Sequence, residues 1–417
     1  MIMEKIKIGI FGINRGASYI NSLLANDAEI VAICDKDEFW LNKAKETMGD
    51  KTTYYTSFDE FYEHPMDAVL LCNYFNEHAP FAIRFLEKGV HVLSECTAAG
   101  TMAECVALVR AAEKSNAKYM LCENYPHMKF NREIKRICDG GTLGKFLYAE
   151  GEYNHPVSGD DVAFNRKYKP YPEHWRNYLP RTYYVTHSLA PIMYATGAKP
   201  IRVTAMPVFA PFDDTFAISG SHCGDRAAII TTLNDDDSVF RVSGCAGFGA
   251  HSNSYRICGT EGQIENLRGM NGQVMLRYNS WNKPEGLEQD NLYDPDWNHK
   301  DAALIEKEGH GGGDFLVIQE FLNCLREDRK PDFDVYFATR MSAVGILAHR
   351  SLLEKGMPYD IPDFSKEEDR VLWENDYLTP FYGPNGEEPT LRCGSREDFV
   401  PPEEAMKAYL ESIKVRE

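Results

Sequence analysis

The sequence lacks an excess of basic residues and any long apolar run. Its 45 lysines and arginines are outnumbered by 63 aspartates and glutamates, which gives a net charge of −18. Proteins that bind nucleic acid need a concentrated basic surface against the phosphates, so we expect no nucleic-acid partner. No apolar run approaches the length that spans a bilayer, and we expect no membrane partner.

Paired cysteine motifs and metal-binding motifs are also missing. The 11 cysteines are scattered singly, no CxxC pair occurs and the total is odd, which predicts reduced thiols. The 12 histidines show no metal-ligand spacing such as HExxH, so we expect no metal site. The opening MIMEKIKIGIFG passes at once into a strand pattern and leaves no room for a signal peptide. We therefore expect a cytoplasmic protein.

The length of the chain predicts more than one domain, because 417 residues exceed one ordinary core. We predict a dinucleotide-binding domain over residues 1–124 and a substrate and oligomerisation domain over residues 125–362. Residues 363–417, rich in Pro, Glu and Asp, are predicted to form an extension packed on the surface.

The first 124 residues alternate short apolar runs with helical patterns. The predicted strands lie in KIGIFG, AEIVAICD, DAVLLCN, GVHVLSE and KYMLCEN, and the predicted helices cover residues 15–26, 38–48, 77–88 and 102–114. Nearly continuous apolar strands that alternate with helices form a parallel sheet covered on both faces. The predicted fold class of this part is therefore α/β, with a Rossmann dinucleotide-binding domain.

The turn after the first strand carries a nucleotide-binding signal. The segment GINRGA, starting at Gly12, is an imperfect G-x-G-x-x-G with Asn14 at the second glycine place, although helix packing alone can demand such a turn. The second strand ends on Asp35, 23 residues later, where a carboxylate can accept the ribose hydroxyls of NAD and repel a 2′-phosphate. A helix N-cap is the alternative role of Asp35. Together the two features predict NAD as cofactor, and the adjacent Lys36 keeps NADP as a lesser possibility.

After residue 124 the pattern changes to long strands with alternating faces. These predicted strands lie in KFLYAEGEYNH, IRVTAMPVF, RAAIITTLN, SVFRVSGCAGF, SYRICGTEGQIEN and QVMLRYN. A helix is predicted over 131–139, a hairpin turn at LNDDDSV, and two late helices near 314–327 and 336–355. The second domain is therefore predicted to be α+β, with a large, mostly antiparallel, open-faced sheet. Apolar residues on both faces of RAAIITTL predict a homo-oligomer, a dimer or tetramer, formed through the open face.

With these motifs the chain resembles the Gfo/Idh/MocA superfamily (glucose–fructose oxidoreductases and inositol dehydrogenases) over roughly residues 5–360. The segment CNYFNEH matches a strand-end motif of that superfamily. The long segment that starts at ENYPHMKF matches its link between domains, and THSLAPIMYATG matches its substrate-domain helix. The cofactor-binding residues predicted from the turn, the acid and the resemblance are Gly12, Asn14, Arg15, Asp35, Asn73, His78, Glu95 and Asn124.

The chain departs from most of that family at the end of the fourth strand. The family pattern there is Glu-Lys-Pro, with the lysine as acid/base beside the nicotinamide, whereas this chain has Glu95, Cys96 and Thr97. The family's aspartate, four residues before the substrate-domain histidine, is replaced by Tyr183. Of the family's lysine, aspartate and histidine, this chain therefore retains only the histidine, His187.

These departures resemble a neighbouring branch, the NAD-dependent glycoside hydrolases exemplified by α-N-acetylgalactosaminidases. That branch has Glu-Val-Pro-Ala-Ala where this chain has ECTAA. Its Tyr-x-Thr-His-x-Leu motif is matched by YVTHSL, and its Gly-His-Gly-Gly-x-Asp-Phe by GHGGGDF at 309–315. Two glycines of its histidine motif are replaced by Ser188 and Ala190, so its exact substrate is not carried over.

The candidate catalytic residues are His187 and Tyr184. An imidazole can take the proton from a sugar hydroxyl as hydride leaves the same carbon, and the tyrosine could share that proton or orient the ring. The alternatives are a helix-capping histidine and a packing tyrosine. Lower-ranked substrate candidates are Cys96, His155, Tyr183, Trp175 and His310. Among them Cys96 is interpreted as a small buried residue and Tyr183 as packing, while Trp175 belongs to the aromatic loop KYKPYPEHWRNY.

We therefore expect an NAD(H)-dependent oxidoreductase that acts on a sugar or glycoside, with hydride transfer at a ring carbon and C3 as the first choice. A C3 ketone acidifies the proton on C2, so a base could remove it and expel the group on C1. With later water addition and return of the hydride, the enzyme would be an NAD-dependent glycosidase. A third interpretation is a non-catalytic regulator that senses a sugar or nucleotide, which the retained His187 argues against.

Overall fold

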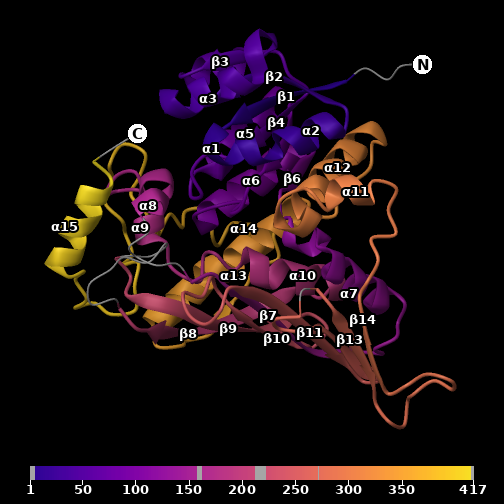
Figure 1. The fold of residues 1–417 in the computed structure, drawn as a ribbon. Helices are drawn as coiled ribbons and strands as arrows, with labels where there is room; N and C mark the ends of the chain where they lie inside the picture. The colour runs from indigo at the N-terminus through magenta and orange to yellow at the C-terminus, as the bar shows by residue number, and fades with distance from the viewer. Residues whose placement is uncertain (1–4, 157–161, 212–221, 271, 415–417) are drawn as a thin grey trace. The chain divides into compact units, whose positions relative to one another are not determined.

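The computed structural model of the protein describes residues 5–156, 162–211, 222–270 and 272–414 (Figure 1). The chain forms two compact units. Unit 1 is built from residues 1–129, 296–342 and 364–376, and unit 2 from residues 130–295, 343–363 and 377–417. Residues 296–342 therefore pack with the N-terminal part of the chain, although in sequence they follow the strands of the second predicted domain.

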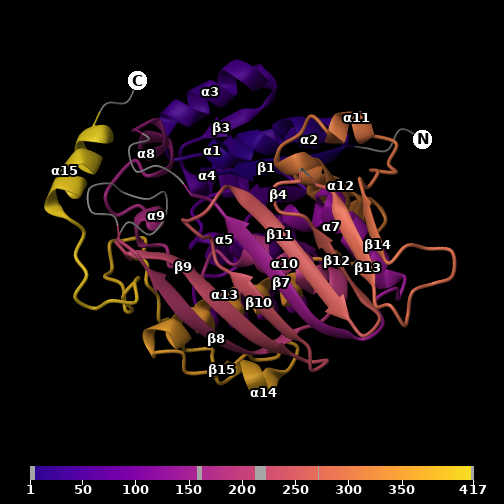
Figure 2. The same cartoon turned by 60° about the horizontal axis from the view of Figure 1, so that its bottom comes forward.

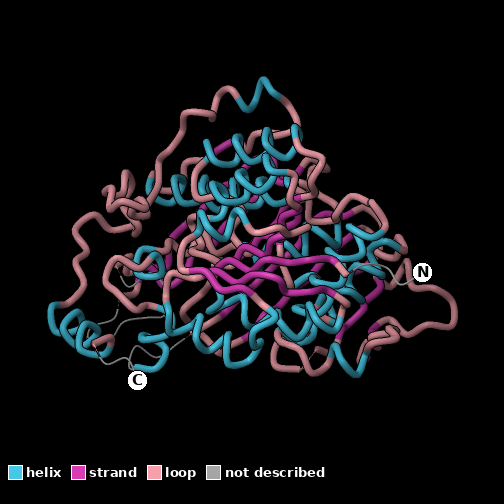
Figure 3. Tube along the Cα trace, turned by 90° about the horizontal axis from the view of Figure 1, so that it is seen from above, coloured by secondary structure: helices cyan, strands magenta, loops and turns pink. Residues whose placement is uncertain are grey.

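Unit 1 contains a six-stranded parallel sheet with the strand order β3-β2-β1-β4-β5-β6. The strands are β1 Ile6–Phe11, β2 Ala28–Cys34, β3 Thr53–Tyr55, β4 Ala68–Leu71, β5 His91–Ser94 and β6 Tyr119–Leu121. The helices between them are α1 Ile13–Gly16, α2 Ile20–Ala25, α3 Glu38–Met48, α4 Phe58–Glu63, α5 His78–Lys88 and α6 Met102–Lys114. Figure 3 shows the strands flanked by helices, which is the arrangement predicted for a Rossmann domain.

The middle of this sheet is the core of unit 1. All four residues of β4 are buried, and Val92 and Leu93 of the neighbouring β5 are buried as well. Each such side chain contributes about 1.5–3 kcal/mol when it leaves water. The later helices α11 Ala302–Ile305 and α12 Gly313–Arg326 also belong to this unit, and α12 packs against α2.

Unit 2 contains a nine-stranded sheet with the strand order β14-β13-β12-β11-β7-β10-β9-β8-β15. Its neighbouring strands run antiparallel, apart from the parallel pair β7 and β10. The strands are β7 Phe146–Asn154, β8 Pro200–Phe209, β9 Asp225–Asn234, β10 Val239–Ser243, β11 Ser252–Gly259, β12 Gly262–Asn266, β13 Val274–Tyr278, β14 Asp290–Tyr293 and β15 Tyr359–Asp360. The predicted fold class, α/β followed by a mostly antiparallel α+β domain, is confirmed.

Unit 2 also contains helices. They are α7 Lys129–Asp139, α8 Val162–Tyr168, α9 Trp175–Tyr178, α10 Thr186–Thr196 and α15 Glu403–Ser412. Helix α10 packs across β7, β10 and β11 (Figure 1). Helix α13, Val335–Leu353, belongs to unit 1 as far as Ser342 and to unit 2 beyond it. No helix in the described ranges is long and apolar enough to cross a membrane.

The other face of the nine-stranded sheet is turned to the viewer in Figure 2. Glu150 of β7 lies at its centre and forms ion pairs of 3.0 Å with Arg241 and 3.1 Å with Arg256. Near one edge, Met206 of β8 stands opposite Ile229 of β9, and these side chains are 56% and 36% exposed. The face therefore combines a charged centre with an apolar margin.

The C-terminal segment is tied to both units along its length. In unit 1 the short α14, Glu367–Arg370, places Arg370 against Glu113 at 2.6 Å. In unit 2 the Ser395 hydroxyl donates to the carboxylate of Asp225 at 2.6 Å, and the Tyr409 hydroxyl donates to the Lys169 carbonyl at 2.8 Å. These contacts pack the segment against the rest of each unit, and the predicted surface extension over residues 363–417 stays a prediction.

Candidate active site

The turn between β1 and α1 can be formed only with glycine at its first position. Gly12 has φ 92°, and a Cβ atom there would lie 2.3 Å from the carbonyl oxygen of Cys72. Its own amide donates to the carbonyl of Cys34 at 2.8 Å, and its carbonyl accepts the amide of Gly16 at 3.0 Å. The backbone therefore passes very close to its neighbour, as the phosphate-binding turn of a Rossmann domain requires.

Asp35 holds this turn from the end of β2. One oxygen of its carboxylate accepts the amide of Ile13 at 2.8 Å, and the other accepts the amide of Asp37 at 2.9 Å. The N-cap of α3 is Asp37, so the alternative role predicted for Asp35 as a helix cap is wrong. Burial raises the pKa of Asp35, and the two backbone amides act in the opposite direction. A carboxylate has about four lone-pair sites, so Asp35 can still accept ribose hydroxyls.

Lys36 is exposed and contacts an aromatic ring. Its Nζ atom lies 4.0 Å from the centre of the Tyr74 ring, a cation–π contact. The lysine would have to leave that ring to meet a 2′-phosphate, which favours NAD over NADP.

We expect Asp35→Ala to weaken NAD binding roughly 10- to 100-fold, the worth of hydrogen bonds to a charged group. NADP binding should change much less, because the substitution also removes the charge that repels its 2′-phosphate. Both dissociation constants can be measured by fluorescence titration, with Asp50→Ala, an exposed carboxylate of the same unit, as the control. An equal loss of affinity for both nucleotides would contradict the placement of Asp35 at the ribose.

Buried side-chain amide groups lie at the carboxyl ends of the strands. The Oδ1 atoms of Asn73, Asn76 and Asn124 are buried, and within the described ranges they have no hydrogen-bond partner. Asn73 follows β4 and Asn124 follows β6, at the edge of the sheet where Rossmann domains bind dinucleotides. Buried acceptors without donors are costly, and a bound dinucleotide can supply donors. Together with Gly12 and Asp35, these residues fit NAD.

Two further predicted residues form an ion pair. The Nε atom of Arg15 donates to Glu95 Oε1 at 2.6 Å, and the Tyr19 hydroxyl donates to the same oxygen at 2.7 Å. Burial acts to raise the pKa of Glu95, but the Arg15 charge and the Tyr19 hydroxyl outweigh it and hold the pKa below its ordinary value. Glu95 is therefore an anion locked to Arg15 and is not a free proton acceptor.

The GHGGGDF segment joins this ion pair through Asp314. Its carboxylate accepts the Asn124 amide at 2.6 Å and Arg15 Nη2 at 3.3 Å, and its second oxygen lies 2.9 Å from His310 Nδ1. Burial acts to raise the pKa of Asp314, but the His310 bond and the Arg15 charge lower it to about 2. Asp314 is the centre of this network. The sequence analysis had placed it only at the start of a helix.

The side chains that stand at the family's lysine and proline places make hydrogen bonds inside unit 1. The Cys96 thiol is buried and donates to Glu123 Oε2 at 3.0 Å. The Thr97 hydroxyl lies 2.8 Å from the hydroxyl of Ser342, and the Thr97 carbonyl lies 2.8 Å from His78 Nδ1. The role of Cys96 as a small buried residue stays a prediction. Glu123, a buried carboxylate next to Asn124, was not predicted, although its place after β6 could have indicated it.

In unit 2 the candidate histidine sits where α10 meets the sheet. Gly151 of β7 allows this approach, because a Cβ atom there would lie 1.8 Å from the Ser188 carbonyl oxygen. His187 is 7% exposed, and its carbonyl accepts the Tyr255 hydroxyl at 2.6 Å. The helix is thereby pinned to β7 and β11 directly at His187.

Aromatic rings surround His187. The Tyr153 ring lies edge-on to it at 5.0 Å, and the Tyr184 ring lies 5.1 Å away. Beyond Tyr153 the contacts continue to His155 at 5.7 Å, and from there to His251 at 4.8 Å. The structure therefore brings together three predicted residues, His187, Tyr184 and His155. Tyr153 and His251 were not predicted. Residues two apart in a strand lie on the same face, so the candidate His155 could have indicated Tyr153.

Burial is the main influence on the protonation of His155 in this cluster. Burial lowers the pKa of His155 to about 4, and the charges of His251, Arg176 and His187 act in the same direction. His155 is therefore neutral at physiological pH and can serve as a hydrogen-bond partner.

The remaining predicted residues lie in other surroundings. The Tyr183 ring contacts His349 at 5.8 Å and Phe381 at 5.3 Å, in keeping with a packing role. Trp175 lies in α9, with the guanidinium of Arg176 4.4 Å from its ring centre. His310 and Cys96 belong to unit 1. Their roles toward substrate remain predictions.

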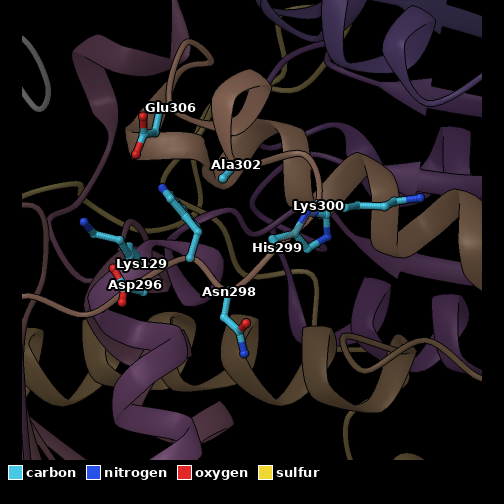
Figure 4. A pocket seen from close by; sticks show the side chains of 8 residues that line it. Lys129, Asp296, Asn298, His299, Lys300, Ala302 and Glu306 are labelled. Atoms are coloured by element: carbon cyan, nitrogen blue, oxygen red, sulfur yellow. The ribbon is translucent and has the colours of Figure 1, made fainter.

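A pocket of about 510 Å³ opens in unit 1 beside the GHGGGDF segment (Figure 4). It is lined by Lys129, Asp296, Trp297, Asn298, His299, Lys300, Ala302 and Glu306. A Cβ atom on Gly312 would lie 2.9 Å from the Trp297 ring, so the tryptophan separates the pocket from the glycines. Its charges are balanced between two lysines and two carboxylates, which indicates no particular ligand.

Comparison with known families gives two matches along the chain. Residues 6–122 match the oxidoreductase family with an NAD-binding Rossmann fold, GFO_IDH_MocA. Residues 225–370 match the C-terminal domain of glycosyl hydrolase 109. The first match confirms the prediction of an NAD-binding Rossmann domain of an oxidoreductase family.

Curated relatives align along most of the chain. Glycosyl hydrolase family 109 protein 1 of Shewanella sp. (strain MR-7) is 25% identical over 403 residues, which cover 89% of this chain and 87% of that protein. The alpha-N-acetylgalactosaminidase of Shewanella oneidensis has the same identity and the same coverage. A glycosyl hydrolase family 109 protein of Streptomyces niveus is 27% identical and covers 87% of this chain and 78% of its own length.

Solved structures share the fold at low identity. A levoglucosan dehydrogenase in complex with NADH and levoglucosan superposes with a TM-score of 0.72 at 16% identity, covering 86% of this chain and 100% of that one. An oxidoreductase from Agrobacterium radiobacter in complex with NAD⁺, L-tartaric acid and magnesium gives a TM-score of 0.68 at 15% identity, covering 86% and 98%. The resemblance inferred from the motifs is thus confirmed: one part of this chain matches the NAD-binding domain of the GFO_IDH_MocA oxidoreductase family, and a later part matches the glycosyl hydrolase 109 C-terminal domain.

Proposed function

We propose that this protein is an NAD(H)-dependent oxidoreductase that acts on a sugar or glycoside, with hydride transfer at a ring carbon, C3. The observation that carries the proposal is the buried His187, whose ring contacts the rings of both Tyr153 and Tyr184. The names of the relatives and of the solved neighbours, which include a levoglucosan dehydrogenase and an alpha-N-acetylgalactosaminidase, support a carbohydrate substrate.

Each group of residues has a separate task in this proposal. Gly12, Asp35, Asn73 and Asn124 would hold the dinucleotide, and bound NAD would supply the acceptor for the hydride. His187 would take the proton of the sugar hydroxyl, the usual task of a positioned imidazole. Tyr153 and Tyr184 keep the imidazole in place, and their ring faces can pack against a sugar ring.

The second candidate function is an NAD-dependent glycosidase. The glycosyl hydrolase 109 match over residues 225–370 favours it. After oxidation at C3 the C2 proton becomes acidic, so a base can remove it and the group on C1 leaves with its electron pair. Water then adds and the ring carbon is reduced again, so the cofactor would act catalytically.

One assay separates these functions. The purified protein is incubated with a panel of aryl glycosides, with and without added NAD. Accumulating NADH indicates a dehydrogenase, and free aglycone indicates cleavage. If neither product forms with any member of the panel, the proposed oxidoreductase function is wrong, and the result favours a non-catalytic binding protein.

We further propose that the protein is cytoplasmic and forms a homo-oligomer through the face of the nine-stranded sheet in Figure 2. The eleven cysteines are free thiols, as in a reducing compartment. The exposed pair Met206 and Ile229 on the sheet margin supports association.

For the oligomer we expect light scattering at micromolar concentration to give at least twice the mass of one chain, 47.4 kDa. Met206→Lys should shift the mass toward the monomer, because it places a charge in the apolar margin. The matched control is Met357→Lys, which changes an equally exposed methionine outside the nine-stranded sheet. A wild-type protein that is monomeric by light scattering would contradict the proposal.

A further inference from the structure

His310 is held by the buried carboxylate of Asp314, and one of its ring nitrogens is left for a ligand. Its Nδ1 atom lies 2.9 Å from Asp314 Oδ2, and the Asp314 side chain is 1% exposed. Burial acts to raise the pKa of Asp314, but the His310 bond and the Arg15 charge lower it to about 2, so the group is an anion. A carboxylate anion can only accept, so Nδ1 of His310 carries the hydrogen. In the described part of the chain its Nε2 atom has no hydrogen-bond partner, and the side chain is 38% exposed.

The loop that carries His310 is shaped around this contact. A Cβ atom on Gly309 would lie 2.5 Å from Asp314 Oδ2, so glycine lets the loop pass close to the carboxylate. His310 itself has φ 53°, in the left-handed region that residues other than glycine seldom adopt. Such a conformation costs free energy and persists only where the surrounding contacts fix it. The imidazole therefore has a fixed place in unit 1.

The same carboxylate binds Asn124, which follows β6. Asn124 Nδ2 donates to Asp314 Oδ1 at 2.6 Å, and this bond turns the amide oxygen away from the carboxylate. Asn124 is 2% exposed, and among the described residues its buried Oδ1 atom has no hydrogen-bond partner. The backbone is also in contact here, because a Cβ atom on Gly313 would lie 2.4 Å from the Asn124 carbonyl oxygen. His310 and Asn124 are therefore neighbours that are held by the two oxygens of one carboxylate.

The strand order places this pair on one side of the Gly12 turn. The turn follows β1, whereas Asp35 follows β2 and Asn124 follows β6. In the order β3-β2-β1-β4-β5-β6, Asp35 and Asn124 therefore lie on opposite sides of the turn. In a Rossmann domain the turn meets the diphosphate, and the acid after the second strand meets the adenosine ribose. The side of Asn124 and His310 is then left for the nicotinamide half of the dinucleotide.

Two neighbouring acceptors fit a pair of hydroxyl donors. Asn124 Oδ1 can only accept, and a neutral imidazole with its hydrogen on Nδ1 accepts at Nε2. A phosphate oxygen without a proton has nothing to donate and would leave Asn124 Oδ1 unpaired. The two hydroxyls of a ribose can each donate one hydrogen bond. Because a buried acceptor without a donor is costly, a ribose diol suits this pair better than a phosphate does.

We propose that His310 binds the nicotinamide ribose of NAD, with one hydroxyl donating to its Nε2 atom and the other to Asn124 Oδ1. This inference rests on the NAD-binding part of the proposed function, and it assigns to His310 a cofactor role in place of the substrate role considered from the sequence. Asp314 is a positioning residue, because it holds both acceptors and keeps the imidazole hydrogen on Nδ1. A sugar substrate also carries hydroxyl pairs, and the experiment separates the two sources.

Isothermal titration calorimetry with fragments of the dinucleotide tests the assignment without turnover. AMP, ADP and ADP-ribose extend the ligand step by step, and of these fragments only ADP-ribose carries the second ribose that NAD has. We expect His310→Ala to weaken ADP-ribose and NAD about 3- to 10-fold, the worth of one hydrogen bond, and to leave AMP and ADP within about twofold. Retained binding of AMP and ADP also shows that the nucleotide site of the variant is folded.

Two further variants provide the controls. His299→Ala is the matched control, because His299 Nδ1 also lies near an aspartate of unit 1, 3.8 Å from Asp301, but its side chain lines the pocket in Figure 4. It should leave the affinity for all four ligands unchanged. Asp35→Ala should give a different pattern and weaken AMP and ADP-ribose by the same factor, because it removes the acceptor for the adenosine ribose.

The outcomes distinguish this inference from the proposed function. If His310→Ala weakens AMP as much as ADP-ribose, His310 is a structural residue and the inference is wrong. Unchanged ADP-ribose binding also overturns it, and a higher KM for the glycoside in that variant would assign the hydroxyls to the sugar. Neither result affects the proposed oxidoreductase. Conversely, ADP-ribose binding that depends on His310 supports the inference even if no glycoside is turned over. A wild-type protein that binds none of the four nucleotides would contradict both proposals.

Discussion

Replacing His187 by alanine should lower turnover by about two to four orders of magnitude, the usual worth of a positioned general base. The residue is 7% exposed and its ring contacts the rings of Tyr153 and Tyr184, so its imidazole has a defined orientation. Alanine removes the proton acceptor and leaves the backbone bond from the Tyr255 hydroxyl in place. The rate is measured with saturating NAD and the best substrate of the glycoside panel, and circular dichroism checks that the variant is folded.

Cys96→Ser is the companion to that variant and should leave turnover within a few-fold of the wild type. The hydroxyl can still donate to Glu123, as the thiol does at 3.0 Å. Cys96→Lys would place a cation in a buried position shaped for a smaller group, and we expect it to lose glycoside binding, with any residual activity resembling simple dehydrogenation. Loss of activity in Cys96→Ser together with a mild His187→Ala would mean that the thiol carries the chemistry.

The second large effect is expected at Asp314, where alanine should cost about 3–5 kcal/mol of unfolding free energy. Its carboxylate is 1% exposed and binds Arg15, Asn124 and His310. Removing it leaves a buried amide and part of an arginine unpaired. The urea midpoint of the unfolding transition measures the loss. Asp59→Ala, which breaks an exposed pair with Arg84, should change the free energy by less than about 1 kcal/mol.

The same carboxylate should make stability depend on pH in the acid range. Its pKa is lowered from 3.8 to about 2, so the stabilisation is complete above about pH 4 and is lost as the pH falls through 2. A shift of this size corresponds to about 2 kcal/mol. The difference in unfolding free energy between wild type and Asp314→Asn should therefore shrink between pH 6 and pH 2.5. A constant difference over that range would contradict the assignment.

Local patterns were sufficient for much of unit 1. The helices predicted over 38–48 and 102–114 are found with those bounds, because each begins at a side-chain cap that is visible in the sequence. Asp37 caps the first, and Thr101 with Glu104 forms the capping box of the second. The strands that alternate with these helices are nearly all apolar, which is how a sheet buried on both faces is recognised. The strand β3, Thr-Tyr-Tyr, was missed because it is only partly buried and has no apolar run.

Contacts between distant segments could not be predicted in the same way. Asp314 joins Arg15 and Asn124 across separations of 299 and 190 residues, and no local propensity records such a pair. The close approach of α10 to β7 could not be predicted either. In the sequence Gly151 is only a glycine within a strand, and the structure is needed to show that the Ser188 carbonyl lies against it. These contacts depend on which segments pack together.

The sequence by itself determined the class of the protein, because the Gly12 turn, the acid at Asp35 and the strand–helix alternation are local signals of dinucleotide binding. It also singled out His187 and Tyr184 in one motif and His155 in a separate segment. Only the tertiary structure decided that these three share one cluster of rings with Tyr153 and His251. No local pattern shows such a cluster, because side chains from separate segments meet only after the chain has folded.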